Sequence, residues 1–194
     1  MLLACGLFVC MPNVEAAAIG ELSTSGRIGY ALAAPILFVD DPDGQTQTTY
    51  MLQPFNLVYT DRLVSTARFW SEVYYQEGTL DPTSKEIGQA IKRVGARLSI
   101  QSHLNLALPG KPWFGVGLQV EKENYSLRHT VDEDGFLLQT YPDRETLAVS
   151  VLVDAATEWR LSRRWDLSGK AAYAIPVNNG IAELAFAAVF LFSF

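Results

Sequence analysis

The last fourteen residues of the chain, 181–194, constrain the fold most, because they are strongly apolar yet alternate in side-chain size. Large side chains occupy every second position from Leu184 to Phe194, with Ala188 as the small exception, and smaller or polar ones lie between them. Successive side chains of a β-strand point to opposite faces. A membrane-spanning helix needs about 20 apolar residues, and this shorter segment also contains Glu183. The pattern therefore predicts a β-strand with an apolar, aromatic outer face.

The same period of two recurs along most of the chain and predicts about eight strands, the number found in the smallest closed membrane barrels. Turn signals separate the segments, among them residues 40–44 and the hairpin signal Asn178-Asn179-Gly180. Pro54 predicts a bulge within the strand expected at 48–60, where Met51 is expected on the face of Phe55. Asp61 and Arg62 are expected to form a reversal. The expected segments cover residues 26–39, 48–60, 63–76, 86–101, 113–125, 145–160, 165–175 and 181–194.

The less apolar face of these strands carries small residues interspersed with charges of both signs. A lipocalin-like soluble barrel would turn this face to water and its apolar face inward, whereas a membrane barrel does the reverse. A water-exposed face would gain nothing from so many Gly and Ala residues, but inside a narrow barrel they leave room for long side chains that must pair. The sequence therefore predicts an all-β, antiparallel up-and-down transmembrane barrel with a salt-bridged interior. The expected lumen charges are Arg27, Arg68, Glu72, Arg93, Arg97, Glu121, Glu123, Asp154, Glu158, Lys170 and Glu183.

Aromatic residues gather at one set of expected strand ends, where the turns are mostly short. Tyr59, Trp113, Trp159 and Trp165 are predicted to form an aromatic girdle at this rim. The opposite ends carry the acidic connections, predicted as outer loops at 40–47, 78–85 and 127–144.

The N-terminal segment, residues 1–18, is expected to be a signal peptide, leaving residues 19–194 as the barrel domain. It has an apolar core followed by small residues, but no Lys or Arg precedes Arg27, which suggests a start site placed too far downstream. The two alternatives are a retained plug helix and a lipoprotein signal in which Cys5 is acylated.

From Gly26 to Phe194 the chain resembles the small eight-stranded outer-membrane proteins of Gram-negative bacteria, the group that contains the transmembrane domain of outer-membrane protein A. The resemblance rests on strand count, alternation and the terminal aromatic residues. It implies that Phe190, Phe192 and Phe194 are an assembly signal read by the barrel-assembly machinery. It also implies a monomer in contact with outer-membrane lipid and lipopolysaccharide, with both termini in the periplasm; any envelope protein partner stays open.

The formal net charge of −6 disfavours a nucleic-acid partner, since phosphate binding needs a concentrated basic face. No cofactor or metal motif is visible. Of the two histidines, His103 is expected near a periplasmic turn, and His129 has Ser126 and Asp132 close in sequence. We expect a non-enzymatic surface scaffold or adhesion-type protein with a plugged lumen. The alternatives are a narrow channel or lateral exit path for small apolar compounds, and a lipid A-modifying enzyme that uses Ser126, His129 and Asp132.

Overall fold

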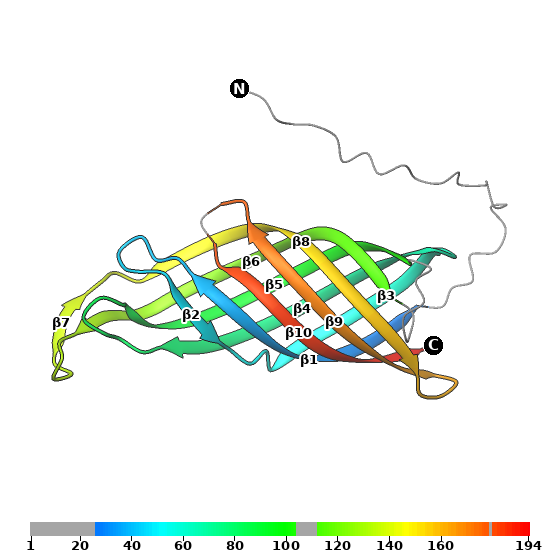
Figure 1. Cartoon of the computed structure of the whole chain (residues 1–194), viewed down its shortest axis with the longest axis horizontal. Helices are drawn as coiled ribbons and strands as arrows, with labels where there is room; N and C mark the ends of the chain where they lie inside the picture. Colours follow the sequence, from blue (N-terminus) through cyan, green and yellow to red (C-terminus); the bar gives the residue numbers. More distant parts are fainter. Residues whose placement is uncertain (1–25, 104–111, 179) are drawn as a thin grey trace, which may run out of the picture.

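The computed structural model describes residues 26–103, 112–178 and 180–194, which form a single antiparallel sheet rolled into a barrel (Figure 1). Within these residues, no helix has the length and apolarity needed to cross a membrane. The strands are β1 (Arg27–Val39), β2 (Gln47–Tyr50), β3 (Phe55–Val64), β4 (Ala67–Leu80), β5 (Gly88–His103), β6 (Trp113–Val131), β7 (Leu137–Thr140), β8 (Arg144–Arg160), β9 (Trp165–Pro176) and β10 (Ala182–Ser193).

The sheet closes because β10 pairs with β1 from Arg27↔Ser193 to Phe38↔Ala182. Eight strands, β1, β3, β4, β5, β6, β8, β9 and β10, form the wall. The short β2 pairs with the far end of β1, and β7 pairs back onto β6 as a hairpin. Closure means that the wall has no edge strand, although β4 beyond Tyr75 has no ladder partner on the side of β2 and β3. The predicted fold class, an eight-stranded up-and-down antiparallel barrel, is confirmed.

The two faces of the wall have opposite character. On the outside, exposed large apolar side chains recur at alternate positions along the wall strands; on β6 these are Phe114, Val116, Leu118 and Val120. On the inside, charged and amide side chains are almost fully buried. A lipocalin-like barrel would have the reverse arrangement, so that alternative is wrong for this chain.

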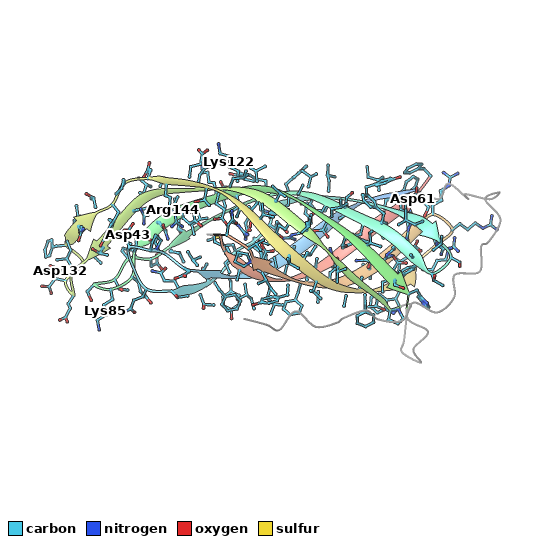
Figure 2. The ribbon with its side chains drawn as sticks, turned by 90° about the horizontal axis from the view of Figure 1, so that it is seen from above. Asp43, Asp61, Lys85, Lys122, Asp132 and Arg144 are labelled. Carbon is cyan, nitrogen blue, oxygen red and sulfur yellow. The ribbon has the colours of Figure 1, made fainter. Side chains whose placement is uncertain are left out.

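The apolar outer band ends well before the strands do. Lys122 pairs with Glu145 on the outer surface, with both side chains exposed, and Lys92 lies opposite Glu77 in the ladder of β4 and β5. Figure 2 shows Lys122 partway along the barrel, Asp61 at one end, and Asp43, Lys85 and Asp132 at the other. We call the part beyond Lys122 and Lys92, made of residues 40–47, 78–89 and 124–144, the outer extension.

The outer extension contains more regular structure than the sequence predicted. β4 runs to Leu80 inside the expected loop 78–85, while β6 runs to Val131 and β7 lies within the expected loop 127–144. Their ladders simply continue past the apolar band, because the inward-facing residues Leu80 and Ile91 still have a packed interior to enter. The loop expected at 40–47 lies between β1 and β2 and ends where β2 begins.

Two local predictions in the second and third strands were wrong. The strand expected at 48–60 is broken between β2 and β3, and the side-chain alternation shifts there. Met51 is buried, with 5% of its surface exposed, whereas Phe55 faces outward. Asp61 and Arg62 belong to β3, and the reversal follows Val64, because the ladder with β4 continues to Val64↔Ala67.

Val116→Arg is expected to destabilise the folded protein in lipid by about 2–4 kcal/mol, because Val116 lies in the middle of the apolar outer band. Leu138→Arg, at a similarly exposed residue of the outer extension, is expected to change stability by less than about 0.5 kcal/mol. Urea unfolding of both variants in lipid vesicles measures the difference. Equal effects would mean that the apolar band does not face hydrocarbon.

Candidate functional site

The interior of the barrel is filled by layers of paired charges. The layer at the end of the barrel that carries the β8–β9 turn contains Arg27 from β1, Arg68 from β4 and Glu158 from β8. Nη1 of Arg27 lies 3.2 Å from Glu158 and 3.3 Å from Asp166, and the guanidinium of Arg68 also binds Glu158. Four strands, β1, β4, β8 and β9, are therefore tied together at this end of the lumen.

The middle layer is built around Glu72 and Lys170. Lys170 Nζ contacts Glu72 and lies 3.2 Å from Asp154, and Nη1 of Arg97 lies 3.3 Å from Glu72. Arg97 also binds Glu183 on β10. These five side chains come from β4, β5, β8, β9 and β10, and each has 3% or less of its surface exposed. Buried charges need such pairing, because an unpaired charge in a low-dielectric interior is strongly destabilising.

Arg93 has more ion-pair partners than any other charged residue in the described part of the chain. It donates to Glu121 at 2.7 Å and to Glu183 at 2.8 Å, and its Nε lies 3.9 Å from Glu123. Glu123 completes its bonding with neutral donors, the hydroxyl of Tyr125 and the backbone N–H of Ile181. One arginine thus serves three carboxylates.

All eleven predicted lumen charges face the interior in these layers. Sequence reasoning missed the neutral side chains that complete the network. Trp70 Nε1 donates to Glu72 at 2.7 Å, and the Tyr74 hydroxyl donates to Glu121 at 2.7 Å. Both lie an even number of residues from the charged residues of the same strand, so they are on the same face of it. This spacing is the signal that identifies them. The amide members of the network include Asn56, Gln76, Gln101 and Gln119.

Small residues on the inner face make room for this network, and Gly95 shows how. A Cβ atom at Gly95 would lie 2.6 Å from the hydroxyl of Tyr74 and 2.9 Å from Cβ of Glu121. Any larger residue would push the tyrosine ring away from Arg97, over which it stacks at 4.3 Å.

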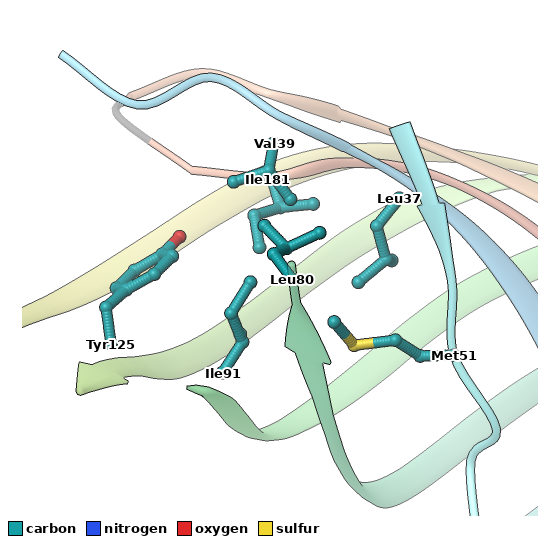
Figure 3. Close-up of a cluster of buried hydrophobic side chains, with 7 residues drawn as sticks. All are labelled: Leu37, Val39, Met51, Leu80, Ile91, Tyr125 and Ile181. Atoms are coloured by element: carbon teal, nitrogen blue, oxygen red, sulfur yellow. The ribbon is translucent and has the colours of Figure 1, made fainter. Parts of the chain in front are cut away.

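An apolar cluster lies beyond the charged layers, toward the outer extension (Figure 3). None of its members has more than 8% of its surface exposed. An eight-stranded barrel is just wide enough for side chains to fill, and here charged and apolar layers together occupy the bore. The cluster consists of Leu37, Val39, Met51, Leu80, Ile91, Tyr125 and Ile181.

A second ion-pair cluster lies in the outer extension, around Arg128. Leu127 has a φ of 57°, and the ladder with β5 shifts register between Ser126 and His129. This bulge turns Arg128 inward, where it donates to Asp41 at 2.7 Å and to Asp43 at 2.8 Å. Burial lowers the pKa of Arg128, but its bonds to Asp43 and Asp41 outweigh burial, so the pKa lies above its usual value. The cluster holds the β1–β2 connection against β6.

The predicted aromatic girdle is placed only in part as expected. Tyr59, Trp159 and Trp165 have 39–49% of their surfaces exposed on the outer wall. Trp113 was wrongly assigned, since only 2% of it is exposed. Its ring packs inside the barrel end, with the guanidinium of Arg68 at 4.3 Å, because the inward-facing charge offers a cation–π partner. Of the three expected assembly-signal residues, Phe190 and Phe192 lie on β10 and Phe194 follows it, with its ring against Gly26.

Ser126, His129 and Asp132 are not joined by any hydrogen bond in the described part of the chain. Nδ1 of His129 faces the carbonyl of Leu127 at 2.7 Å, and Asp132 accepts from the backbone N–H groups of Asp134 and Phe136. His103 packs edge-on against the ring of Trp113 at the other end.

Within residues 26–103, 112–178 and 180–194, no cluster of three His, Cys, Asp or Glu side chains is arranged to hold a metal. The signal-peptide and lipoprotein predictions fall on residues 1–18, outside the described residues.

Arg93→Met is expected to destabilise the barrel by about 3–5 kcal/mol, because it leaves Glu121, Glu123 and Glu183 buried without their shared cation. Lys122→Met, which breaks the exposed pair with Glu145, is the matched control and is expected to cost less than about 1 kcal/mol. Urea unfolding in lipid vesicles compares them. A small effect at Arg93 would show that the interior pairs are not needed for the fold.

Comparison with known proteins supports the fold and leaves sequence kinship open. No family model and no curated protein matches the chain. Among solved structures, Neisserial surface protein A matches with a TM-score of 0.57 and 11% identity, over 87% of this chain and 97% of that one. The attachment invasion locus protein Ail of Yersinia pestis matches with a TM-score of 0.52 and 11% identity, over 88% of this chain and 97% of that one. Outer membrane protein OprG from Pseudomonas aeruginosa matches with a TM-score of 0.50 and 10% identity, over 87% of this chain and 93% of that one. The chain therefore has the fold of the small eight-stranded outer-membrane β-barrel proteins.

Proposed function

We propose that the protein is a non-enzymatic, surface-exposed scaffold or adhesion-type protein of the outer membrane of a Gram-negative bacterium, with a plugged lumen. The observation that carries this proposal is the contrast between the two parts of the barrel. The interior is filled with paired side chains, whereas the outer extension has exposed polar and apolar surface outside the apolar band. A rigid barrel that presents outer segments beyond the membrane is suited to contact with partners.

The charge of the outer extension limits the partners it favours. Its residues include nine Asp or Glu side chains and three Lys or Arg side chains. Ail has been solved in complex with a heparin analogue, sucrose octasulfate. The acidic outer extension of the present chain favours basic or neutral partners instead, because like charges repel an anionic polysaccharide. Exposed Phe136, Leu137 and Leu138 at the tip add apolar contact surface.

A gap between two strands supports a second candidate, a lateral path for small apolar compounds. β2 pairs with β1 but forms no ladder with β4, although β3, which follows it, does. The Met51 side chain lies against Gly78 at this gap, where a Cβ atom on the glycine would meet the sulfur at 2.7 Å. Met51 is itself a member of the apolar cluster of Figure 3. This arrangement would let an apolar molecule reach the interior if the methionine moved.

The proposal predicts which residues face the cell exterior. Glu133→Cys, in the outer extension, is expected to react with a membrane-impermeant maleimide on intact cells. Thr66→Cys, in the turn between β3 and β4, is expected to react only after permeabilisation. The parent chain, whose two cysteines are Cys5 and Cys10, gives the background labelling. Labelling of Thr66→Cys on intact cells would overturn the proposed orientation.

The two candidate functions differ in their effect on uptake of an apolar probe. For a plugged scaffold, expression of the chain is expected to leave the entry rate of 1-N-phenylnaphthylamine into intact cells unchanged, because the interior stays filled. Faster entry that Met51→Trp then abolishes would favour the lateral path. The Leu138→Trp variant, with its substitution in the outer extension away from the gap, is the control.

A further inference from the structure

The turn between β8 and β9 is basic in a chain that is acidic overall. Arg160, Arg163 and Arg164 lie within five residues, and residues 159–165 contain no Asp or Glu. The flanking carboxylates Glu158 and Asp166 both pair with Arg27. The positive charge of the turn is therefore not neutralised by its neighbours in sequence. Figure 1 shows this turn at the end of the barrel where the C-terminus lies.

The turn has a defined shape. The backbone N–H groups of Leu161 and Ser162 both donate to the carbonyl of Trp165, at 3.0 Å each. The hydroxyl of Ser162 accepts from the N–H of Trp165 at 3.2 Å. The carbonyl of Arg164 accepts from the N–H of Ser193, which ties the turn to the end of β10. The backbone under the arginines is thus held in place by bonds within the turn and to the neighbouring strand.

The three arginines have different tasks. Arg160 donates to the carbonyls of Ser162 and Arg163, at 3.1 and 3.0 Å, and so stabilises the turn. The side chains of Arg163 and Arg164 are exposed, and within the described residues they form no hydrogen bond or ion pair. Two guanidinium groups are left to bind something outside the chain.

Two tryptophans place the turn at the edge of the apolar band. Trp159 and Trp165 flank it, with 42% and 49% of their surfaces exposed on the outer wall. The ring of Trp159 lies over Gly169, and Trp165 packs edge-on against Phe192 at 5.1 Å between ring centres. Tryptophan rings favour the headgroup level of a bilayer. Arg163 and Arg164 lie only a few residues beyond these rings, which is the level of lipid phosphates.

We infer that the β8–β9 turn is a binding site for the headgroups of anionic phospholipids in the leaflet at this end of the barrel. Guanidinium groups pair with phosphate through two parallel N–H···O bonds, and each basic residue at a membrane surface adds to the attraction for anionic lipid. Leu161, 58% exposed between the arginines, has apolar surface to place among the acyl chains. The assignment of this leaflet to the periplasmic side rests on the proposed function.

The four tryptophans of the chain make the site measurable. Trp70 and Trp113 are buried, so only Trp159 and Trp165, which flank the turn, contact lipid on the outer wall. The full chain is refolded into phosphatidylcholine vesicles that contain either brominated phosphatidylcholine or brominated phosphatidylglycerol, and quenching of tryptophan fluorescence is recorded. Phosphatidylglycerol is expected to quench with about two- to fivefold higher apparent affinity at low salt, and salt is expected to weaken this preference.

The Arg163→Gln/Arg164→Gln variant is expected to lose the preference. The Arg62→Gln/Lys85→Gln variant carries the same change in net charge at exposed sites elsewhere and is expected to keep it. Equal quenching by both lipids in the unmodified chain, or a preference that survives in the Arg163/Arg164 variant, would overturn the inference. Absence of quenching by either lipid would instead contradict the membrane location on which the proposed function depends.

Discussion

The structure depends on pairing charges inside a tube too narrow for bulk water. Each buried carboxylate or guanidinium has a large desolvation cost that only a close partner offsets. Glu72, Arg93, Arg97 and Glu183 are 0–3% exposed, and each contacts at least two oppositely charged groups. Because these partners come from strands on different sides of the barrel, the same contacts that satisfy the charges also hold the wall in its closed shape.

This arrangement explains the distribution of the other residue types. The polar network occupies the inner face, so the apolar side chains that a soluble protein would bury lie on the outside, where lipid replaces the protein core. Small residues such as Gly95 lie where network side chains need space. With the interior filled, the surfaces left for interaction are the outer extension, the lipid-facing wall and the turns at the other end.

The sequence predicted the fold because the alternation of side chains along a strand is a local property. It can be recognised without knowing which residues pair in the folded barrel. The sequence could not identify interior partners such as Arg93 and Glu183, which are 90 residues apart and meet only across the closed barrel. Prediction from the sequence also failed where the inward–outward alternation shifts by one residue. The break before Phe55 placed Met51 inside, and the bulge at Leu127 turned Arg128 inward. Trp113 was misplaced because aromatic residues at strand ends are equally suited to a girdle and to stacking on a buried arginine.

The central claim, that paired side chains close the lumen, is tested most directly by single-channel recording of the refolded protein in a planar bilayer. Gel electrophoresis first shows, by the resistance of the protein to unfolding, that it is folded. This protein is predicted to give no discrete openings, because the charged layers and the apolar cluster fill the bore. Reproducible openings of the unmodified chain would contradict the account and would identify Arg93, Arg97, Glu121 and Asp154 as pore-lining residues instead.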